Sequence, residues 1–169
     1  GRDSEATLPV WSASDGYPGD AAYREFHRDI GWEVPEEELQ AAGILSSRPL
    51  GLKLRRVSGG DCPLNGKLPY QPAAATRKAQ EHAHSYVNER LRQLEELDGV
   101  MDRPPLVVAP FDAELFGHWW FEGPQFLEQV FIQGQKLLIV KPNLDQIVIM
   151  DYQKFLENPW LNIIGINTK

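Results

Sequence analysis

Carboxylates and large aromatic rings are concentrated in residues 109–124, which read Ala-Pro-Phe-Asp-Ala-Glu-Leu-Phe-Gly-His-Trp-Trp-Phe-Glu-Gly-Pro. Cleavage of a glycosidic bond needs a carboxyl group that donates a proton to the leaving oxygen and a second carboxylate on the opposite face of the sugar ring. Asp112 and Glu114 are two residues apart, so they would share one side of an extended strand. Indole rings such as those of Trp119 and Trp120 can stack on the apolar faces of sugars. The segment therefore has the residue types that carbohydrate chemistry requires.

The same residues have simpler interpretations, which the residue types alone leave open. An aspartate that ends a strand, like Asp112, is more often a helix N-cap or a turn residue than a catalyst. Trp119 and Trp120 could pack in a core, because aromatic side chains serve mainly for burial. His118 by itself is a weak candidate for catalysis. A tyrosine beside a Pro-Gly turn, like Tyr17, is ordinarily an exposed loop residue.

The elements around this segment favour an α/β fold. Apolar residues spaced by threes and fours predict a long helix over residues 72–97, with a proline in its first turn. Prolines at 104 and 105 then precede the continuous apolar run 106–109, which is typical of a parallel strand covered on both faces. Catalytic groups of an α/β barrel lie at the C-terminal ends of strands, and Asp112 has such a position. A helix followed by a buried strand predicts a barrel or a layered sheet.

Further elements are predicted on both sides of the long helix. Pro18 and Gly19 suit the centre of a type II turn, which would place Tyr17 at an exposed tip. Asp20 would then cap a helix that ends at Gly31. The remaining expectations are a short helix within residues 33–42, a strand at 51–57, a helix after Pro124, and strands at 137–140 and 147–150.

Composition narrows the class of protein. The chain has 169 residues, enough for one core, and a net charge of -7 that opposes binding to nucleic acid but not to a neutral polymer. Cys62 is the only cysteine, which excludes an intramolecular disulfide and fits a cytoplasmic location. His82 and His84 lie about 200° apart on the predicted helix, so they cannot chelate one metal. No apolar run reaches the roughly 18 residues of a membrane span. We expect no membrane segment, no nucleic acid, no metal and no cofactor.

Residues 111–120, Phe-Asp-Ala-Glu-Leu-Phe-Gly-His-Trp-Trp, resemble the fourth sequence region of glycoside hydrolase family 57, and most closely that of its branching enzymes. Other segments agree with the family in the same order: Val-Trp-Ser-Ala, Gly-Tyr-Pro-Gly-Asp, Tyr-Arg-Glu-Phe, Arg-Asp-Ile-Gly, and Lys67 with Pro-Tyr. The resemblance covers residues 1–131. These residues would be the C-terminal part of a catalytic barrel, and residues 132–169 would be an unassigned tail.

The resemblance implies part of an incomplete seven-stranded (β/α) barrel without its N-terminal strands, and a retaining reaction through a covalent glycosyl-enzyme intermediate. Asp112 would be the general acid/base, and Glu114 would orient substrate hydroxyls or tune Asp112. Tyr17 would lie on a mobile loop that closes over the site and favours a sugar acceptor over water. The donor subsites would be lined by His118, Trp119 and Trp120.

The chain also departs from the family pattern. The nucleophilic glutamate of the family lies upstream of the part matched here, so we expect the chain alone to be inactive or nearly so. The implied function is that of a 1,4-α-glucan branching enzyme acting on glycogen, starch or amylose. An amylase or 4-α-glucanotransferase of the same family and a non-catalytic glucan-binding remnant remain alternatives.

Overall fold

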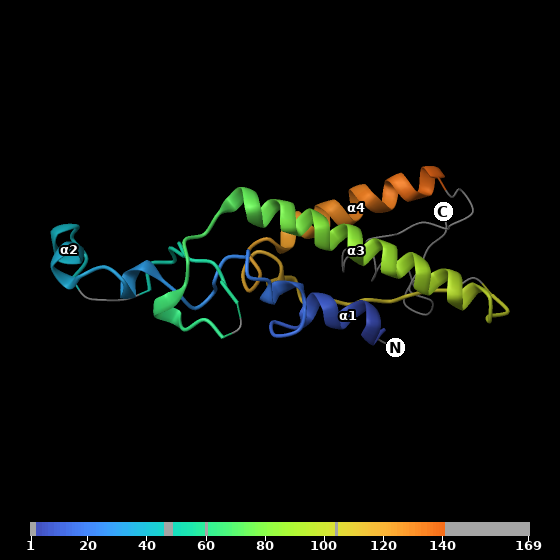
Figure 1. The fold of residues 1–169 in the computed structure, drawn as a ribbon, viewed down its shortest axis with the longest axis horizontal. Helices are drawn as coiled ribbons and strands as arrows, with labels where there is room; N and C mark the ends of the chain where they lie inside the picture. Colours follow the sequence, from blue (N-terminus) through green and yellow to red (C-terminus); the bar gives the residue numbers. More distant parts are fainter. Residues whose placement is uncertain (1–2, 46–48, 60, 104, 141–169) are drawn as a thin grey trace, which may run out of the picture.

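The fold consists of helices joined by long loops in a computed structural model that describes residues 3–45, 49–59, 61–103 and 105–140 (Figure 1). The α-helices are α1 (Ser4–Trp11), α2 (Glu36–Ala41), α3 (Pro72–Asp98) and α4 (Gly123–Val140). Short 3-10 helices lie at Tyr17–Gly19, Ile30–Trp32, Leu64–Gly66 and Ala113–Leu115. In the described ranges, β pairing is limited to isolated bridges. Helix packing therefore positions the site.

The long helix α3 is the centre of the fold and confirms the prediction for residues 72–97. Pro72 occupies its first turn, where a missing backbone N–H is tolerated. Ala75, Ala79 and Ala83 are fully buried on one face, and these small side chains let α4 approach closely. Helix α4 runs beside α3 (Figure 1) and adds Phe126 to the shared core. The core therefore lies mainly between these two helices.

Helix α1 is fastened to α3 by polar contacts. The Asp3 carboxylate caps α1 by accepting the N–H of Ala6 at 2.8 Å. From α3, the Arg90 guanidinium donates to the backbone oxygen of Glu5 at 2.8 Å and to its carboxylate at 3.1 Å. The Gln93 amide donates to Asp3 at 2.9 Å. These contacts fix α1 against the C-terminal part of α3.

The prediction of a helix between Asp20 and Gly31 is wrong. Asp20 does accept the N–H of Ala22 at 2.8 Å, but the chain beyond it forms turns, bends and one isolated bridge before the 3-10 helix Ile30–Trp32. The N–H of Glu25 donates to Arg55 at 2.8 Å, and Tyr23 accepts from the N–H of residue 57 at 2.8 Å. Pairing with this distant segment satisfies the backbone groups that a helix would have satisfied locally. The apolar residues that suggested one face of a helix therefore lie in different environments.

The predicted strands are also absent from the described part of the chain. Residues 51–57 form only isolated bridges, and residues 106–109 are half-buried or exposed and form no ladder. A strand needs a neighbour that accepts and donates along its edge, and here the oxygen of Val108 accepts only from Asp3, at 3.0 Å. The α/β class is therefore not visible in these residues, and the seven-stranded barrel stays a prediction.

The last described element also corrects a prediction. Residues 137–140, expected as a strand, continue α4, which begins after Glu122 as expected for a helix near Pro124. The predicted strand at 147–150 lies outside the described residues. The short helix expected within residues 33–42 is confirmed as α2, which lies far from α3 at one end of the fold (Figure 1). No helix in the described ranges could span a membrane.

Candidate functional site

Residues 111–121 form a compact loop that leads into α4. After the 3-10 turn Ala113–Leu115, the N–H of Trp120 donates to Leu115 at 2.8 Å. Gly117 reverses the chain with a φ of +96°, a conformation that favours glycine, and its N–H donates to Trp120 at 2.8 Å. Backbone hydrogen bonds within the loop therefore close it. Some of its side chains lie in the core and others lie at the surface.

Trp120 anchors this loop in the core. Its side chain is 2% exposed and packs against Tyr23 and Phe126, with ring centroids 5.4 and 4.9 Å away. Its indole N–H has no hydrogen-bond partner within the described part of the chain. The ring offers no open face to a sugar here, and its place in a donor subsite stays a prediction.

Asp112 and Glu114 present their carboxylates to solvent. Asp112 stands at the N-cap position of the 3-10 turn, where its backbone oxygen accepts the N–H of Leu115 at 3.1 Å, but its side chain makes no capping hydrogen bond. Neither carboxylate has an ion pair or hydrogen bond to the residues that the structure describes. The side chain of Asp112 therefore does not cap this turn, although the residue occupies the N-cap position, and its catalytic role stays a prediction.

The exposed part of the loop borders a hollow of about 240 Å³. The ring of Trp119 is 53% exposed and stacks on Phe26, with centroids 4.5 Å apart and planes 30° apart. The ring of His118 meets Phe26 edge-on at 5.6 Å. The complete lining is Arg24, Phe26, Gly51, Lys53, Gly117, His118, Trp119 and Phe121. The structure thus brings two of the predicted site residues together in one concave surface.

Two cations in this hollow were not anticipated from the sequence. The guanidinium of Arg24 lies 3.5 Å from the centroid of the Phe121 ring. The ammonium of Lys53 lies 5.4 Å from the Phe26 ring and 3.6 Å from the carboxylate of Asp29. Arg24 and Phe26 belong to the Tyr-Arg-Glu-Phe segment that agrees with the family. That agreement marked the segment but assigned no role to either residue. No sequence signal pointed to Lys53.

A buried aspartate shapes the edge of the hollow. The Asp29 carboxylate accepts the N–H groups of Gly31 and Leu50 at 2.8 Å and of Gly51 at 2.9 Å. Burial by itself would raise the pKa of Asp29, but these N–H donors and the nearby Lys53 ammonium outweigh it and lower the pKa. Asp29 therefore stays charged and holds residues 50 and 51 in place.

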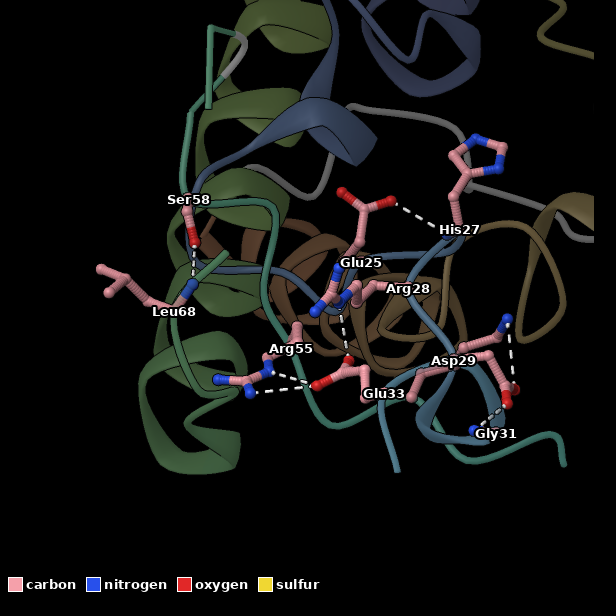
Figure 2. A network of polar contacts seen from close by, with 10 residues as sticks. Glu25, His27, Arg28, Asp29, Gly31, Glu33, Arg55, Ser58 and Leu68 are labelled. Atoms are coloured by element: carbon pink, nitrogen blue, oxygen red, sulfur yellow. Dashed lines mark hydrogen bonds and ion pairs between the residues drawn. The ribbon is translucent and has the colours of Figure 1, made fainter. Parts of the chain in front are cut away.

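Other carboxylates near the hollow are also used for structure (Figure 2). Glu33 joins Arg28, at 2.8 Å, to Arg55, at 3.0 Å. Glu25 accepts the N–H of residue 27 and pairs with Lys67 at 3.0 Å, where both side chains are less than a tenth exposed. These groups carry paired charges and are poor candidates for proton transfer. In the described residues, no group of three or more His, Cys, Asp or Glu side chains could hold a metal ion.

Tyr17 does not stand at an exposed tip. It begins the 3-10 turn Tyr17–Gly19, which replaces the expected type II turn, and its ring stacks on His82 with centroids 4.4 Å apart. Its ring also lies 5.6 Å from Phe126, and burial raises its pKa to about 12. The imidazole of His82 is held in turn by the hydroxyl of Tyr23, 2.8 Å from Nδ1. The mobile-loop role predicted for Tyr17 would require this packing to break.

Comparison with curated proteins shows which proteins this sequence is similar to. The chain is 40% identical over 131 residues to a probable 1,4-alpha-glucan branching enzyme of Mycobacterium tuberculosis. It is 36% identical over 129 residues to the 1,4-alpha-glucan branching enzyme of Thermococcus kodakarensis. These matches cover 77% and 76% of this chain but 22% and 17% of the two relatives. The chain thus spans about a fifth of their length. No family model matches the chain.

Solved structures give the same result. An alpha-amylase of Thermotoga maritima matches with a TM-score of 0.73 and 35% identity, over 86% of this chain and 30% of that one. The family 57 branching enzyme of Pyrococcus horikoshii matches with a TM-score of 0.66 and 34% identity, over 94% of this chain and 25% of that one. The chain is therefore similar to glucan-active enzymes in sequence and in fold. In particular, the resemblance to family 57 branching enzymes is confirmed.

Proposed function

We propose that this chain supplies the general acid/base and part of the substrate surface of a retaining 1,4-α-glucan branching enzyme. The supporting observation is that Asp112, a carboxylate without partners in the described structure, stands in the loop that also carries His118 and Trp119 to the aromatic hollow. The similarity to branching enzymes over 131 residues connects this geometry to a glucan substrate. Glycogen, starch or amylose would be that substrate, and the enzyme would act in the cytoplasm.

The proposed chemistry uses Asp112 twice. Its protonated carboxyl gives a proton to the glycosidic oxygen as the bond breaks, and its carboxylate then removes the proton from the hydroxyl of the incoming acceptor chain. A second carboxylate forms the covalent intermediate, and we assign no residue of this chain to that role. Glu114, two residues further on, would orient substrate hydroxyls. In this proposal residues 1–131 belong to a seven-stranded barrel and residues 132–169 follow it.

The test is Asp112→Asn in the full-length protein that carries this chain. We expect the formation of α-1,6 branches on amylose to fall by about 100-fold or more, because the leaving oxygen loses its proton donor. A matched control is Asp102→Asn, which changes another exposed aspartate whose partner is the exposed Arg103. Unchanged branching in Asp112→Asn would overturn the proposal.

A leaving-group comparison separates acid catalysis from a structural role. A p-nitrophenyl glycoside releases p-nitrophenolate, which leaves without protonation. Asp112→Asn should therefore slow glycosyl-enzyme formation from this substrate far less than from amylose. An equal loss on both substrates would instead indicate that the variant damages the site.

A hydrolytic enzyme is a second candidate function, because the T. maritima alpha-amylase matches the fold with a TM-score of 0.73. Product analysis distinguishes the two. An amylase would release new reducing ends from amylose without α-1,6 linkages, whereas a branching enzyme would create α-1,6 linkages with little change in reducing ends.

A further inference from the structure

We infer that His82 is a pH-sensitive anchor for the turn Tyr17–Gly19: the neutral imidazole holds this turn against α3, and protonation of the imidazole releases it. The inference goes beyond the proposed function, because it concerns the position of the turn and not the proton donor of the reaction. It identifies the contact that has to break before Tyr17 can leave the core between α3 and α4.

The imidazole of His82 contacts the turn and the residues that follow it. One face of the ring stacks on Tyr17, with centroids 4.4 Å apart and planes 22° apart. The Tyr23 hydroxyl lies 2.8 Å from Nδ1, and the Asp20 carboxylate lies 3.6 Å from Nε2. A single side chain of α3 therefore holds three residues of the segment 17–23.

The partners of the two ring nitrogens define which neutral form of His82 is present. A carboxylate accepts hydrogen bonds and donates none, so Nε2 carries the hydrogen that faces Asp20. Nδ1 is then the unprotonated nitrogen, and the Tyr23 hydroxyl donates to it. Burial raises the pKa of Tyr23, which keeps this hydroxyl protonated and able to donate.

A second proton on the imidazole disturbs this arrangement. It would occupy Nδ1, so the hydrogen of the Tyr23 hydroxyl would have to turn away from His82. Tyr23 is fully buried, and its hydroxyl has no other hydrogen-bond partner among the residues that the structure describes. A buried hydroxyl without an acceptor is unfavourable, so the packed turn opposes protonation of His82.

The charged groups around His82 act in both directions. Burial of the imidazole lowers its pKa most, and the Lys78 ammonium on the same helix lowers it further. The carboxylates of Asp20 and Glu81 raise the pKa of His82, but the net effect is a lowered pKa. Glu81 is exposed and pairs with Lys78 at 2.5 Å, which reduces its effect on the imidazole.

The direction of the pH dependence follows from the lowered pKa. The ordinary pKa of histidine is 6.5, and below this value His82 takes up a proton in the open segment before it does so in the packed one. The packed turn is therefore fully stable above about pH 6.5 and loses stability as the pH falls toward the lowered pKa. Glu122, which lies near Tyr23 and has a raised pKa, would act in the opposite direction, since it loses its proton as the pH rises.

Amide hydrogen exchange measures the opening of the turn. The N–H of Asp20 donates to Tyr17 at 3.0 Å and that of Tyr23 donates to Asp20 at 3.0 Å, so both amides are protected while the turn is packed. In the full-length protein that carries this chain, their protection, corrected for the intrinsic exchange rate, should fall by up to about 10-fold from about pH 7.5 to about pH 5.5. Equal protection at the two pH values would overturn the inference.

Two variants remove the group that titrates. His82→Phe keeps an aromatic face for Tyr17, and protection in this variant should no longer fall with pH. His82→Gln also cannot titrate, and its amide can still donate to Asp20, so it serves if melting curves show that His82→Phe is unfolded. The matched control is His84→Gln, because His84 is exposed on α3 two residues away and its replacement should retain the pH dependence. A pH dependence that persists in the folded His82 variants would overturn the inference.

NMR spectroscopy of the unsubstituted protein, with carbon-13 at the histidine Cε1 positions, reads the protonation itself. The His82 signal is the one that disappears in His82→Gln. Its titration midpoint should lie below the ordinary value of 6.5. A midpoint at or above 6.5 would show that the packed turn does not oppose protonation, and the inference would fail.

The outcomes separate this inference from the proposed function. Lost branching in Asp112→Asn, together with pH-independent protection of the turn, would overturn the role of His82 and leave the catalytic proposal intact. Protection that falls with pH, together with full branching in Asp112→Asn, would support the role of His82 and contradict the catalytic role of Asp112.

Discussion

Glu122 is a fully buried carboxylate immediately before α4. Its side chain is 0% exposed, and one oxygen accepts the N–H of Arg24 at 3.1 Å. The other oxygen, Oε2, has no hydrogen-bond partner in the described residues. Burial raises the pKa of Glu122, because the charged form loses its hydration, and this effect outweighs the nearby Tyr70 hydroxyl and Arg24, which lower the pKa. The protonated form is therefore favoured in the folded protein over a wider pH range than in the unfolded chain.

This shift makes stability depend on pH in a defined direction. Above the usual pKa of 4.5, the unfolded chain loses the Glu122 proton while the folded protein keeps it. The free energy of unfolding therefore falls as the pH rises from 4.5 to the raised pKa. Glu122→Gln removes this pH-dependent loss of stability. The melting temperature of the variant, relative to that of the unsubstituted protein, should therefore be higher at about pH 7 than at about pH 4.

Thermal melts of the 169-residue chain at both pH values measure the difference. Glu128→Gln is the control, since Glu128 is exposed on α4 and its replacement should give the same small difference at both pH values. A constant difference for Glu122→Gln across the pH range would contradict the raised pKa.

The sequence predicted the loop of the site better than its surroundings. His118 and Trp119 were found because residue type and a long motif coincide in one short segment. Trp120 has the same residue type, and only its packing on Tyr23 and Phe126 shows that it is buried. Arg24 could not be chosen from the sequence, because its position depends on a ring nearly a hundred residues away.

At the scale of elements, the turn Tyr17–Gly19 connects α1 to the core between α3 and α4. It packs on α1, and Tyr17 stacks on His82 of α3. The turn is tight, since a Cβ atom on Gly19 would lie 2.2 Å from the backbone oxygen of Ala13. Glycine is therefore required there by close packing against the backbone.

Gly19→Ala should destabilise the chain by roughly 1–3 kcal/mol, because a backbone carbonyl cannot move aside as a flexible side chain could. Gly66→Ala is the matched control, as a Cβ there would meet its nearest atom at an ordinary 3.5 Å. Urea denaturation followed by circular dichroism measures both variants. Equal urea midpoints for the two variants would contradict the tight packing of Gly19 against the backbone.

Elements differ in how far they could be predicted. The helix α3 was predicted within a residue because its apolar spacing continues over many turns and a proline marks its start. Residues 20–31 have a similar spacing over only two turns, and backbone pairing with residues 55–57 overrides it. Residues 137–140 are a short apolar run, which does not distinguish a strand from the end of a helix.

At the scale of the whole molecule, large apolar side chains remain exposed on two separate surfaces. Leu8 and Trp11 lie three residues apart on α1 and are 59% and 56% exposed. A second surface has Leu52, Leu54 and Leu68, each about half exposed, with residues 54–56 hydrogen-bonded to residues 68–70. Single exposed apolar residues are ordinary, but neighbouring ones favour association.

The 169-residue chain alone should therefore self-associate in a concentration-dependent manner. Ammonium sulfate should strengthen the association, because burial of apolar surface is favoured by salts that are excluded from proteins. Sedimentation velocity on the double variant Leu8→Glu and Trp11→Glu should show a larger monomer fraction. A control that exchanges charge elsewhere, Arg92→Glu on the exposed face of α3, should leave association unchanged. A monomer at every concentration, or association that sulfate weakens, would show that these apolar surfaces do not govern the behaviour of the isolated chain.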